Sequence, residues 1–208
     1  GVLIGWLNGY LVTKTNLPAF VVTLASMFIV MGATLGATRL IVGSTSVTMT
    51  ADPFFQTIFG NLIFGLFETA VAWWAVVALI VSWILYKTIY GNWIYAIGGD
   101  MVSARATGIP VNKVRIALFM GSGFGAALVG VIQTCIYNGA QVAAGQSFVF
   151  NSIIAVVVGG VLLTGGYGST IGVILGTMTF AIVNQGIFYT GWDSDWASLI
   201  LGILLLIA

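Results

Sequence analysis

Histidine is absent from the sequence, cysteine occurs once, and only 5% of the 208 residues carry a charge. With Cys135 alone and no histidine, the chain cannot assemble a Cys/His zinc site, a Cys/His nucleophile or an internal disulfide. It also contains no phosphate-binding loop, dinucleotide fingerprint or basic patch for nucleic acid. These absences argue against an enzyme of the common hydrolytic kinds, a metalloprotein or a nucleic-acid-binding protein.

Hydrophobic residues, in contrast, make up 60% of the chain, and the mean hydropathy is +1.12. We predict an all-α, polytopic transmembrane helical bundle that forms a single domain over residues 1–208. A helix needs about 20 apolar residues to cross a bilayer. The expected spans are 1–12 (partial), 18–42, 69–86, 116–137, 148–163 (short), 171–189 and 197–208 (partial). Because both ends lie in apolar runs, we expect a chain truncated at both ends.

The apolar pattern has one long polar break, at residues 87–115. Four of the six basic residues lie in it: Lys87, Arg105, Lys113 and Arg115. If this break faces the cytoplasm, Lys14 does so too and only Arg39 lies outside, in agreement with the preference of basic loops for the cytoplasm. Residues 43–67 and 138–147 then become external loops.

A short helix is predicted inside this break. Asp100 is placed to cap its free N–H groups, residues 101–107 give about two turns, and Gly108 provides a left-handed stop before Pro110. A short helix between two membrane spans is a docking element more often than a catalytic one.

Glycine is abundant, with 28 residues, and often recurs at a spacing of four. Small residues four apart let two helix backbones approach closely inside lipid. We therefore predict helix-packing positions, with a moving seam as the less favoured alternative. The pairs are Gly32 and Gly36, Gly121 and Gly125, and Gly172 and Gly176.

Polar side chains within the spans are few and uncharged. Gln133, Asn151 and Asn184 suit a pathway for a neutral, hydroxyl-rich solute, although each could instead form a hydrogen bond between helices. Asn151 is the stronger pathway candidate because it lies in the short segment, and interrupted helices often line cavities. No ionisable group suitable for ion coupling is visible in the spans, which favours transport driven from outside the chain.

The segment Thr164-Gly-Gly-Tyr-Gly168 is similar to the carbonyl-lined filter of potassium channels. A stand-alone channel is therefore one alternative. A simple turn, with a positive φ at Gly166 or Gly168, is the favoured interpretation.

Several motifs together resemble one family, the permease subunits of bacterial ABC importers for simple sugars of the ribose/xylose/galactoside type. The matching stretches cover most of the chain. They are Gly5-x-x-Asn8-Gly9, Leu17-Pro-Ala-Phe-Val-Val-Thr-Leu24, Tyr95-Ala-Ile-Gly-Gly99, Ala155-Val-Val-Val-Gly-Gly160 and Gly165-Gly-x-Gly168-Ser169. Many relatives carry Asn where this chain has Asp100.

The resemblance implies a multi-pass permease of the bacterial inner membrane, a transporter subunit and not an enzyme. It implies a second permease copy, a periplasmic or lipid-anchored sugar-binding protein, and a cytoplasmic ABC ATPase that holds ATP and Mg²⁺, with no cofactor in this chain. The short helix would then be the coupling helix. Its expected ATPase-coupling residues are Gly99, Asp100, Ser103, Ala104, Arg105, Gly108 and Ile109. A branched-chain amino-acid permease and a non-transporting scaffold remain alternatives.

Overall fold

The computed structural model of the chain describes residues 1–15, 17–49, 51–63, 67–189, 191 and 195–207. These residues form two compact units, each of which is described by itself. Unit 1 comprises Gly1–Val76 and Pro110–Gly145, and unit 2 comprises Val77–Ile109 and Gln146–Ala208.

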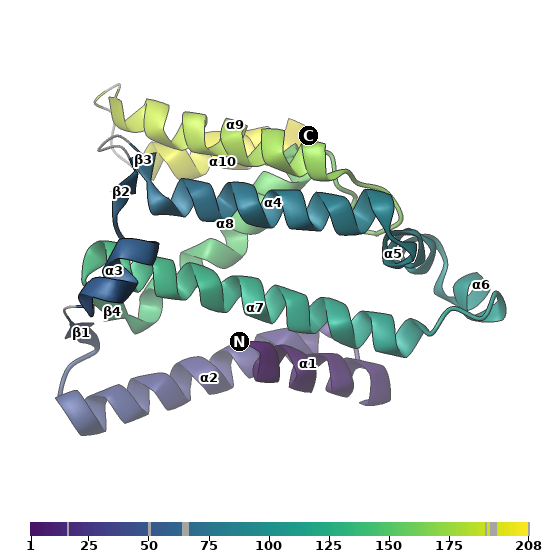
Figure 1. Cartoon of the computed structure of the whole chain (residues 1–208), viewed down its shortest axis with the longest axis horizontal. Coiled ribbons are helices and arrows are strands. Elements are labelled where there is room, and N and C mark those ends of the chain that lie inside the picture. Colours follow the sequence, from purple (N-terminus) through teal and green to yellow (C-terminus); the bar gives the residue numbers. More distant parts are fainter. Residues whose placement is uncertain (16, 50, 64–66, 190, 192–194, 208) are drawn as a thin grey trace. The chain divides into compact units, whose positions relative to one another are not determined.

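The centre of unit 1 is the pair α1 (Val2–Thr15) and α7 (Val111–Tyr137), which lie side by side in Figure 1. Their backbones approach closely at glycines: a Cβ on Gly5 would lie 2.3 Å from the carbonyl oxygen of Phe119. Asn8 is buried on α1, and its Oδ1 has no hydrogen-bond partner among the described residues. The close contact explains why α1 packs although its sequence has no strongly apolar face.

The next helix, α2 (Ala19–Val42), is apolar throughout, and Val22 is its only buried residue within the described part of the chain. It begins directly after Pro18, whose missing N–H costs nothing at a helix start. Its last turn contains Arg39, and Gly43 ends it with a φ of +77°. Over 24 residues it is about 36 Å long, enough to cross a bilayer.

Short elements fill the two expected external loops of unit 1. Strand β1 (Ser46–Thr48) pairs antiparallel with β4 (Gly139–Gln141), which the 3₁₀ turn η1 (Val142–Ala144) follows. Helix α3 (Pro53–Phe59) is capped by Asp52 and packs on α7. The indole N–H of Trp73 donates to the carbonyl oxygen of Ile58 at 3.1 Å, which fixes α3 to the start of the following helix. A second antiparallel pair joins β2 (Leu62–Ile63) and β3 (Phe67–Glu68).

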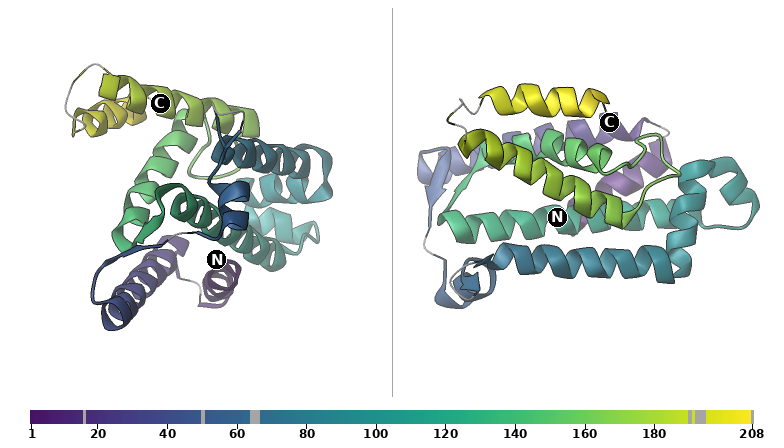
Figure 2. Two further views of the ribbon diagram at one scale, coloured as in Figure 1. Left: turned by 60° about the vertical axis from the view of Figure 1, so that its left-hand side comes forward. Right: turned by 90° about the horizontal axis from the view of Figure 1, so that it is seen from above.

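Helix α4 (Thr69–Lys87) leads from unit 1 into unit 2. There it is followed by α5 (Ile89–Gly99) and α6 (Met101–Ala106), and later by α8 (Gly145–Val158), α9 (Thr170–Tyr189) and α10 (Asp195–Ile207). Helices α9 and α10 lie beside each other in Figure 2. Helix α8 packs closely against α9: a Cβ on Gly176 of α9 would lie 2.3 Å from the carbonyl oxygen of Ala155 in α8.

The predicted fold class is confirmed: within the described residues, α2, α4, α7 and α9 are long and apolar enough to cross a membrane, and α8 is a shorter apolar helix. One additional helix and two boundaries differ from the sequence prediction. The break at 87–115 contains the additional helix α5, and α7 already begins at Val111. Helix α8 ends at Val158 and not near residue 163, because the chain turns at Gly160 with a φ of +77°. Ala208, the last residue of the final expected span, lies outside the described residues.

Candidate functional site

Helix α6 forms as the sequence predicts, and Asp100 organises its start. One carboxylate oxygen of Asp100 accepts from the N–H of Val102 at 3.0 Å, and the other accepts from the N–H of Ser103 at 3.2 Å and from the Ser103 hydroxyl. These bonds favour the ionised form and hold the pKa of Asp100 below its ordinary value, with the Ser103 hydroxyl as the largest cause. The N–H groups that would otherwise lack partners at the start of α6 are therefore satisfied by one side chain.

The end of α6 is equally well defined. Gly108 has a φ of +85°, and its N–H donates to the carbonyl oxygen of Arg105 at 3.0 Å. The N–H of Ile109 donates to the carbonyl oxygen of Ala104 at 3.2 Å, which closes the last turn. A residue with a Cβ is disfavoured at such a positive φ, so Gly108 is the residue that lets the chain leave α6 here.

The two faces of α6 differ in their exposure. Ala104 is 4% exposed and packs inside the protein, so a bulky residue there would displace α6 itself. Val102 is 77% exposed, and Ser103, Arg105 and Ala106 are exposed as well. An exposed valine beside an arginine suits a partner with an apolar groove and an acidic rim. Val102 is not among the residues expected from the sequence, because only its exposure distinguishes it from the other apolar residues.

Among the other expected coupling residues, Gly99 is exposed at the end of α5 and Ile109 is half-buried. Asp100 ends α5 and begins α6, so no linker separates the two helices. Its own N–H donates to the carbonyl oxygen of Ala96 in α5 at 3.1 Å. The two helices are therefore joined directly at a single residue.

The three candidate pathway residues lie on three different helices. In unit 1, Gln133 is half-buried on α7. In unit 2, Asn151 is half-buried on α8, one turn before Ala155, and Asn184 is exposed on α9. Asn151 thus continues the row of α8 that faces α9, since residues four apart share a helix face.

The glycine pairs fall into two groups. Gly172 and Gly176 of α9 lie against the backbone of Gly159, just after α8, and of Ala155 in α8, where a Cβ would come within 2.2 and 2.3 Å of a carbonyl oxygen. The other four glycines meet no described atom within 4 Å of an added Cβ, and their packing role stays a prediction. These are Gly32, Gly36, Gly121 and Gly125.

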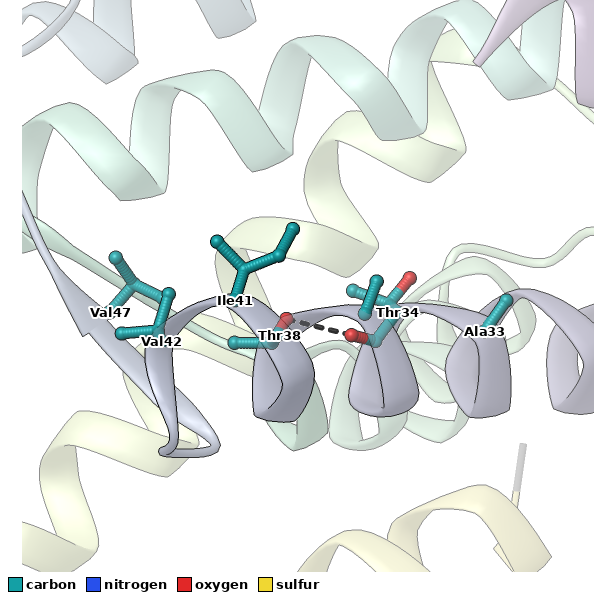
Figure 3. Close-up of a pocket in the computed structure, with 7 residues that line it drawn as sticks. Ala33, Thr34, Thr38, Ile41, Val42 and Val47 are labelled. Carbon is teal, nitrogen blue, oxygen red and sulfur yellow. Dashed lines mark hydrogen bonds between the residues drawn. The ribbon is translucent and has the colours of Figure 1, made fainter.

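An open groove of about 430 Å³ runs along the second half of α2 (Figure 3). The hydroxyls of Thr34 and Thr38 donate to backbone carbonyls of α2 itself, at 2.7 Å each. The groove therefore presents mainly small and apolar groups. Its lining residues are Ala33, Thr34, Ala37, Thr38, Ile41, Val42 and Val47.

The glycine-rich segment between α8 and α9 forms a turn. Gly165 and Gly166 have φ values of +93° and +79°, so the prediction of a positive φ holds at Gly166 but not at Gly168. The N–H of Leu162 donates to the carbonyl oxygen of Tyr167 at 3.2 Å, and that of Gly165 to the carbonyl oxygen of Leu162 at 3.0 Å. The carbonyl of Tyr167 is thus engaged within the turn and does not point into an ion filter, which disfavours the channel alternative. Among the described residues no group of His, Cys, Asp and Glu side chains is suited to hold a metal ion.

Several apolar helices long enough to cross a bilayer, with a capped and partly exposed short helix between two of them, define a multi-pass inner-membrane protein of the permease class. The chain belongs to the family of the branched-chain amino acid transport system permease component, whose model matches residues 1–208. This confirms the family resemblance, since the family is one of permease components of transport systems and its members include sugar import permeases.

Curated relatives carry the names of sugar permeases. The ribose import permease protein RbsC of Bacillus subtilis is 34% identical over 202 residues, which cover 97% of this chain and 61% of the relative. RbsC of Escherichia coli K12 is 31% identical over 211 residues, covering 100% of this chain and 64% of the relative. The fructose import permease protein FrcC of Rhizobium meliloti is 31% identical, covering 100% and 58%. The chain thus spans less than two thirds of the length of these relatives. No solved structure matches it significantly.

Proposed function

We propose that this chain is the membrane-spanning part of a permease that imports a monosaccharide across the bacterial inner membrane with energy from ATP. Two of the relatives described above are named as ribose import permeases and one as a fructose import permease, which supports a sugar as the solute. The observation that carries the proposal is α6, a capped short helix with an exposed valine and arginine in the main polar break of the chain.

In this proposal α6 is the coupling helix, and its exposed face docks into a groove of a cytoplasmic ABC ATPase. That ATPase holds ATP and Mg²⁺, so this chain needs no cofactor of its own. A second permease copy completes the translocation pathway, and a periplasmic or lipid-anchored binding protein delivers the sugar. Lys14 and Arg39 lie at the ends of consecutive helices with one crossing between them, so they fall on opposite sides of the membrane. Placing Lys14 and the 87–115 segment in the cytoplasm then leaves Arg39 as the only one of the six basic residues outside, which supports this orientation.

The uncharged amides of Gln133, Asn151 and Asn184 are the proposed polar contacts of the sugar within the membrane. Amides can donate to and accept from hydroxyl groups without the large desolvation cost of a charged side chain. Because they are few, most of the selectivity would lie in the binding protein. Asn151 is the favoured contact of the three, since it is half-buried beside the α8–α9 contact.

The proposal is tested by transport in proteoliposomes that contain the complete permease, its ATPase and its binding protein. Radiolabelled ribose, fructose, xylose and leucine are supplied on the side of the binding protein, with or without Mg-ATP on the ATPase side. We expect uptake of a sugar that depends strictly on ATP. Uptake of leucine alone would establish the amino-acid alternative, and uptake without ATP would establish a channel.

A pair of charge reversals tests α6 within the same assay. Arg105→Glu introduces an acidic group on the proposed docking face and should reduce ATP-driven uptake at least tenfold, because an unfavourable charge contact costs several kilocalories per mole. Lys113→Glu is the matched control, since it reverses the same charge in the same polar break but on α7. Equal loss of uptake in both variants would contradict a docking role for α6.

A further inference from the structure

Two of the motifs that carry the family resemblance lie against each other within unit 2, although 73 residues separate them. The hydroxyl of Tyr95 in α5 donates to the carbonyl oxygen of Gly168 at 2.8 Å. The hydroxyl of Tyr86, at the end of α4, accepts from the N–H of Thr170 at the start of α9 at 3.1 Å. Figure 1 shows the segment between α8 and α9 passing beside α5.

Glycine backbones meet at the same place, with no side chain between them. A Cβ added to Gly98 of α5 would lie 2.5 Å from the backbone nitrogen of Gly166, and one added to Gly165 would lie 2.8 Å from the carbonyl oxygen of Gly98. Contacts this short leave no room for a methyl group unless the backbone moves. Gly98 thus permits a direct contact between α5 and the turn.

The tyrosine at this contact is protonated at all physiological pH values. Burial raises the pKa of Tyr95 above its ordinary value, and the neighbouring Tyr86 raises it further. The phenolic hydrogen is therefore always available for the bond to Gly168. The contact therefore does not depend on pH in the physiological range, which suits a mechanical role.

Both partners of the contact are themselves rigidly connected. On one side, Asp100 joins α5 to α6 with no linker, as described above. On the other side, the Ser169 hydroxyl accepts from the N–H of Gly172 at 3.0 Å and caps α9. Helix α9 then packs on α8 through Gly172 and Gly176. A continuous set of short contacts therefore runs from α6 to the helices that carry Asn151 and Asn184.

We propose that Tyr86, Tyr95 and Gly98 are positioning residues that fasten α5 and α6 to the α8–α9 turn, so that α6 and α9 move as one body during transport. We call this contact the tyrosine–glycine clasp; it comprises Tyr86, Tyr95, Gly98, Gly165, Gly166, Gly168 and Thr170. The inference rests on the proposed function, because it assumes that an ATPase moves α6. It adds the route by which that movement reaches the solute pathway.

Hydroxyl deletions test whether the clasp transmits force. Tyr95→Phe removes the bond to Gly168, whereas Tyr90→Phe makes the same change on an exposed residue of α5 for which the described structure gives no hydroxyl bond. In the complete transporter we expect Tyr95→Phe to lower the number of sugars imported per ATP hydrolysed about fivefold, the factor that one net hydrogen bond gives. ATP hydrolysis itself should persist, and Tyr90→Phe should behave as the wild type.

Gly98→Ala is the stronger variant, since its methyl group has no space, and we expect at least a tenfold loss in the same ratio. The matched control is Gly202→Ala on α10, where an added Cβ meets no described atom within 4 Å. If Tyr95→Phe and Gly98→Ala keep the wild-type ratio of transport to hydrolysis, the clasp does not transmit force and the inference is wrong.

A distance measurement separates this inference from the proposed function. Spin labels at Ala96→Cys on α5 and Leu175→Cys on α9 report on two exposed positions of unit 2, with Cys135→Ala removing the native thiol. The distance between the labels should be the same without nucleotide and in the vanadate-trapped state. In the Gly98→Ala variant the distribution of this distance should become broader. If the label distance differs between these two states in a transporter that still imports sugar with ATP, the clasp is wrong and the proposed function stands. Loss of ATP dependence in the transport assay would overturn the proposed function and with it the transmission of force, while the label distance in the resting permease would still report whether the contact forms.

Discussion

Asp100 is the residue on which the exposed helix depends, because it ends α5 and caps α6 at the same time. Asp100→Ala removes the acceptor for the N–H groups of Val102 and Ser103, and the unfolding equilibrium of α6 should shift about fivefold toward the frayed state. Asp100→Asn keeps a capping side chain and is the matched control. The measurement is limited trypsin cleavage after Arg105 in inside-out membrane vesicles. Equal cleavage of the two variants would contradict the capping role.

The ionised state of Asp100 predicts how α6 responds to acid. Its pKa is lowered in the folded state, so the stabilisation by the carboxylate is complete above the ordinary Asp value of about 3.9 and is lost as the pH falls through the lowered value. Between roughly pH 5 and 8 the helix should therefore show no pH-dependent fraying. Hydrogen exchange of the amides of residues 102–106, corrected for the intrinsic pH dependence of exchange, measures this. If exchange protection of α6 instead changed near neutral pH, a group other than the Asp100 carboxylate would be capping the helix.

At the scale of elements, the contact between α8 and α9 rests on glycine. Gly176→Ala places a methyl group against the carbonyl oxygen of Ala155 and should destabilise the permease by about 1–3 kcal/mol, the usual cost of overpacking. Gly186→Ala, on the same helix, meets no described atom within 4 Å and should be neutral or slightly stabilising, because alanine favours the helix. The thermal unfolding midpoint in detergent should fall for the first variant only. Equal unfolding midpoints for the two variants would mean that α8 and α9 move apart at little cost, so that their close contact does not stabilise the permease.

The same elements show what the sequence could and could not reveal. The start and end of α6 were predictable because a capping aspartate and a left-handed glycine act locally. Which glycines meet another helix was not predictable. Among these glycines of α7, Gly123 lies against the start of α1, with an added Cβ 2.6 Å from the carbonyl oxygen of Gly1, whereas Gly121 and Gly125 do not. A spacing of four indicates a shared face, but only the partner helix decides which face is covered.

Helix α5 shows a second limit. Its residues are largely apolar and aromatic, and hydropathy alone does not distinguish a short helix from the end of a span or from a loop. The clasp was unpredictable for a related reason, since its two bonds join residues more than 70 positions apart. Each motif was visible in the sequence, whereas their proximity is a property of the fold.

At the scale of the whole molecule, the proposed function requires that α6 faces the cytoplasm and that the β1 region faces outward. Cysteines at Ser103 on α6 and Ser44 just after α2 test this, since both positions are exposed and the native Cys135 is buried. A membrane-impermeant maleimide added to intact cells should label Ser44→Cys alone, and the same reagent added to inside-out vesicles should label Ser103→Cys alone. The basic residues of the 87–115 segment supply the physical reason, because positive charge is retained on the cytoplasmic side. Labelling of position 103 in intact cells would show that the topology is the reverse of the proposed one. An ATPase inside the cell could then not reach α6.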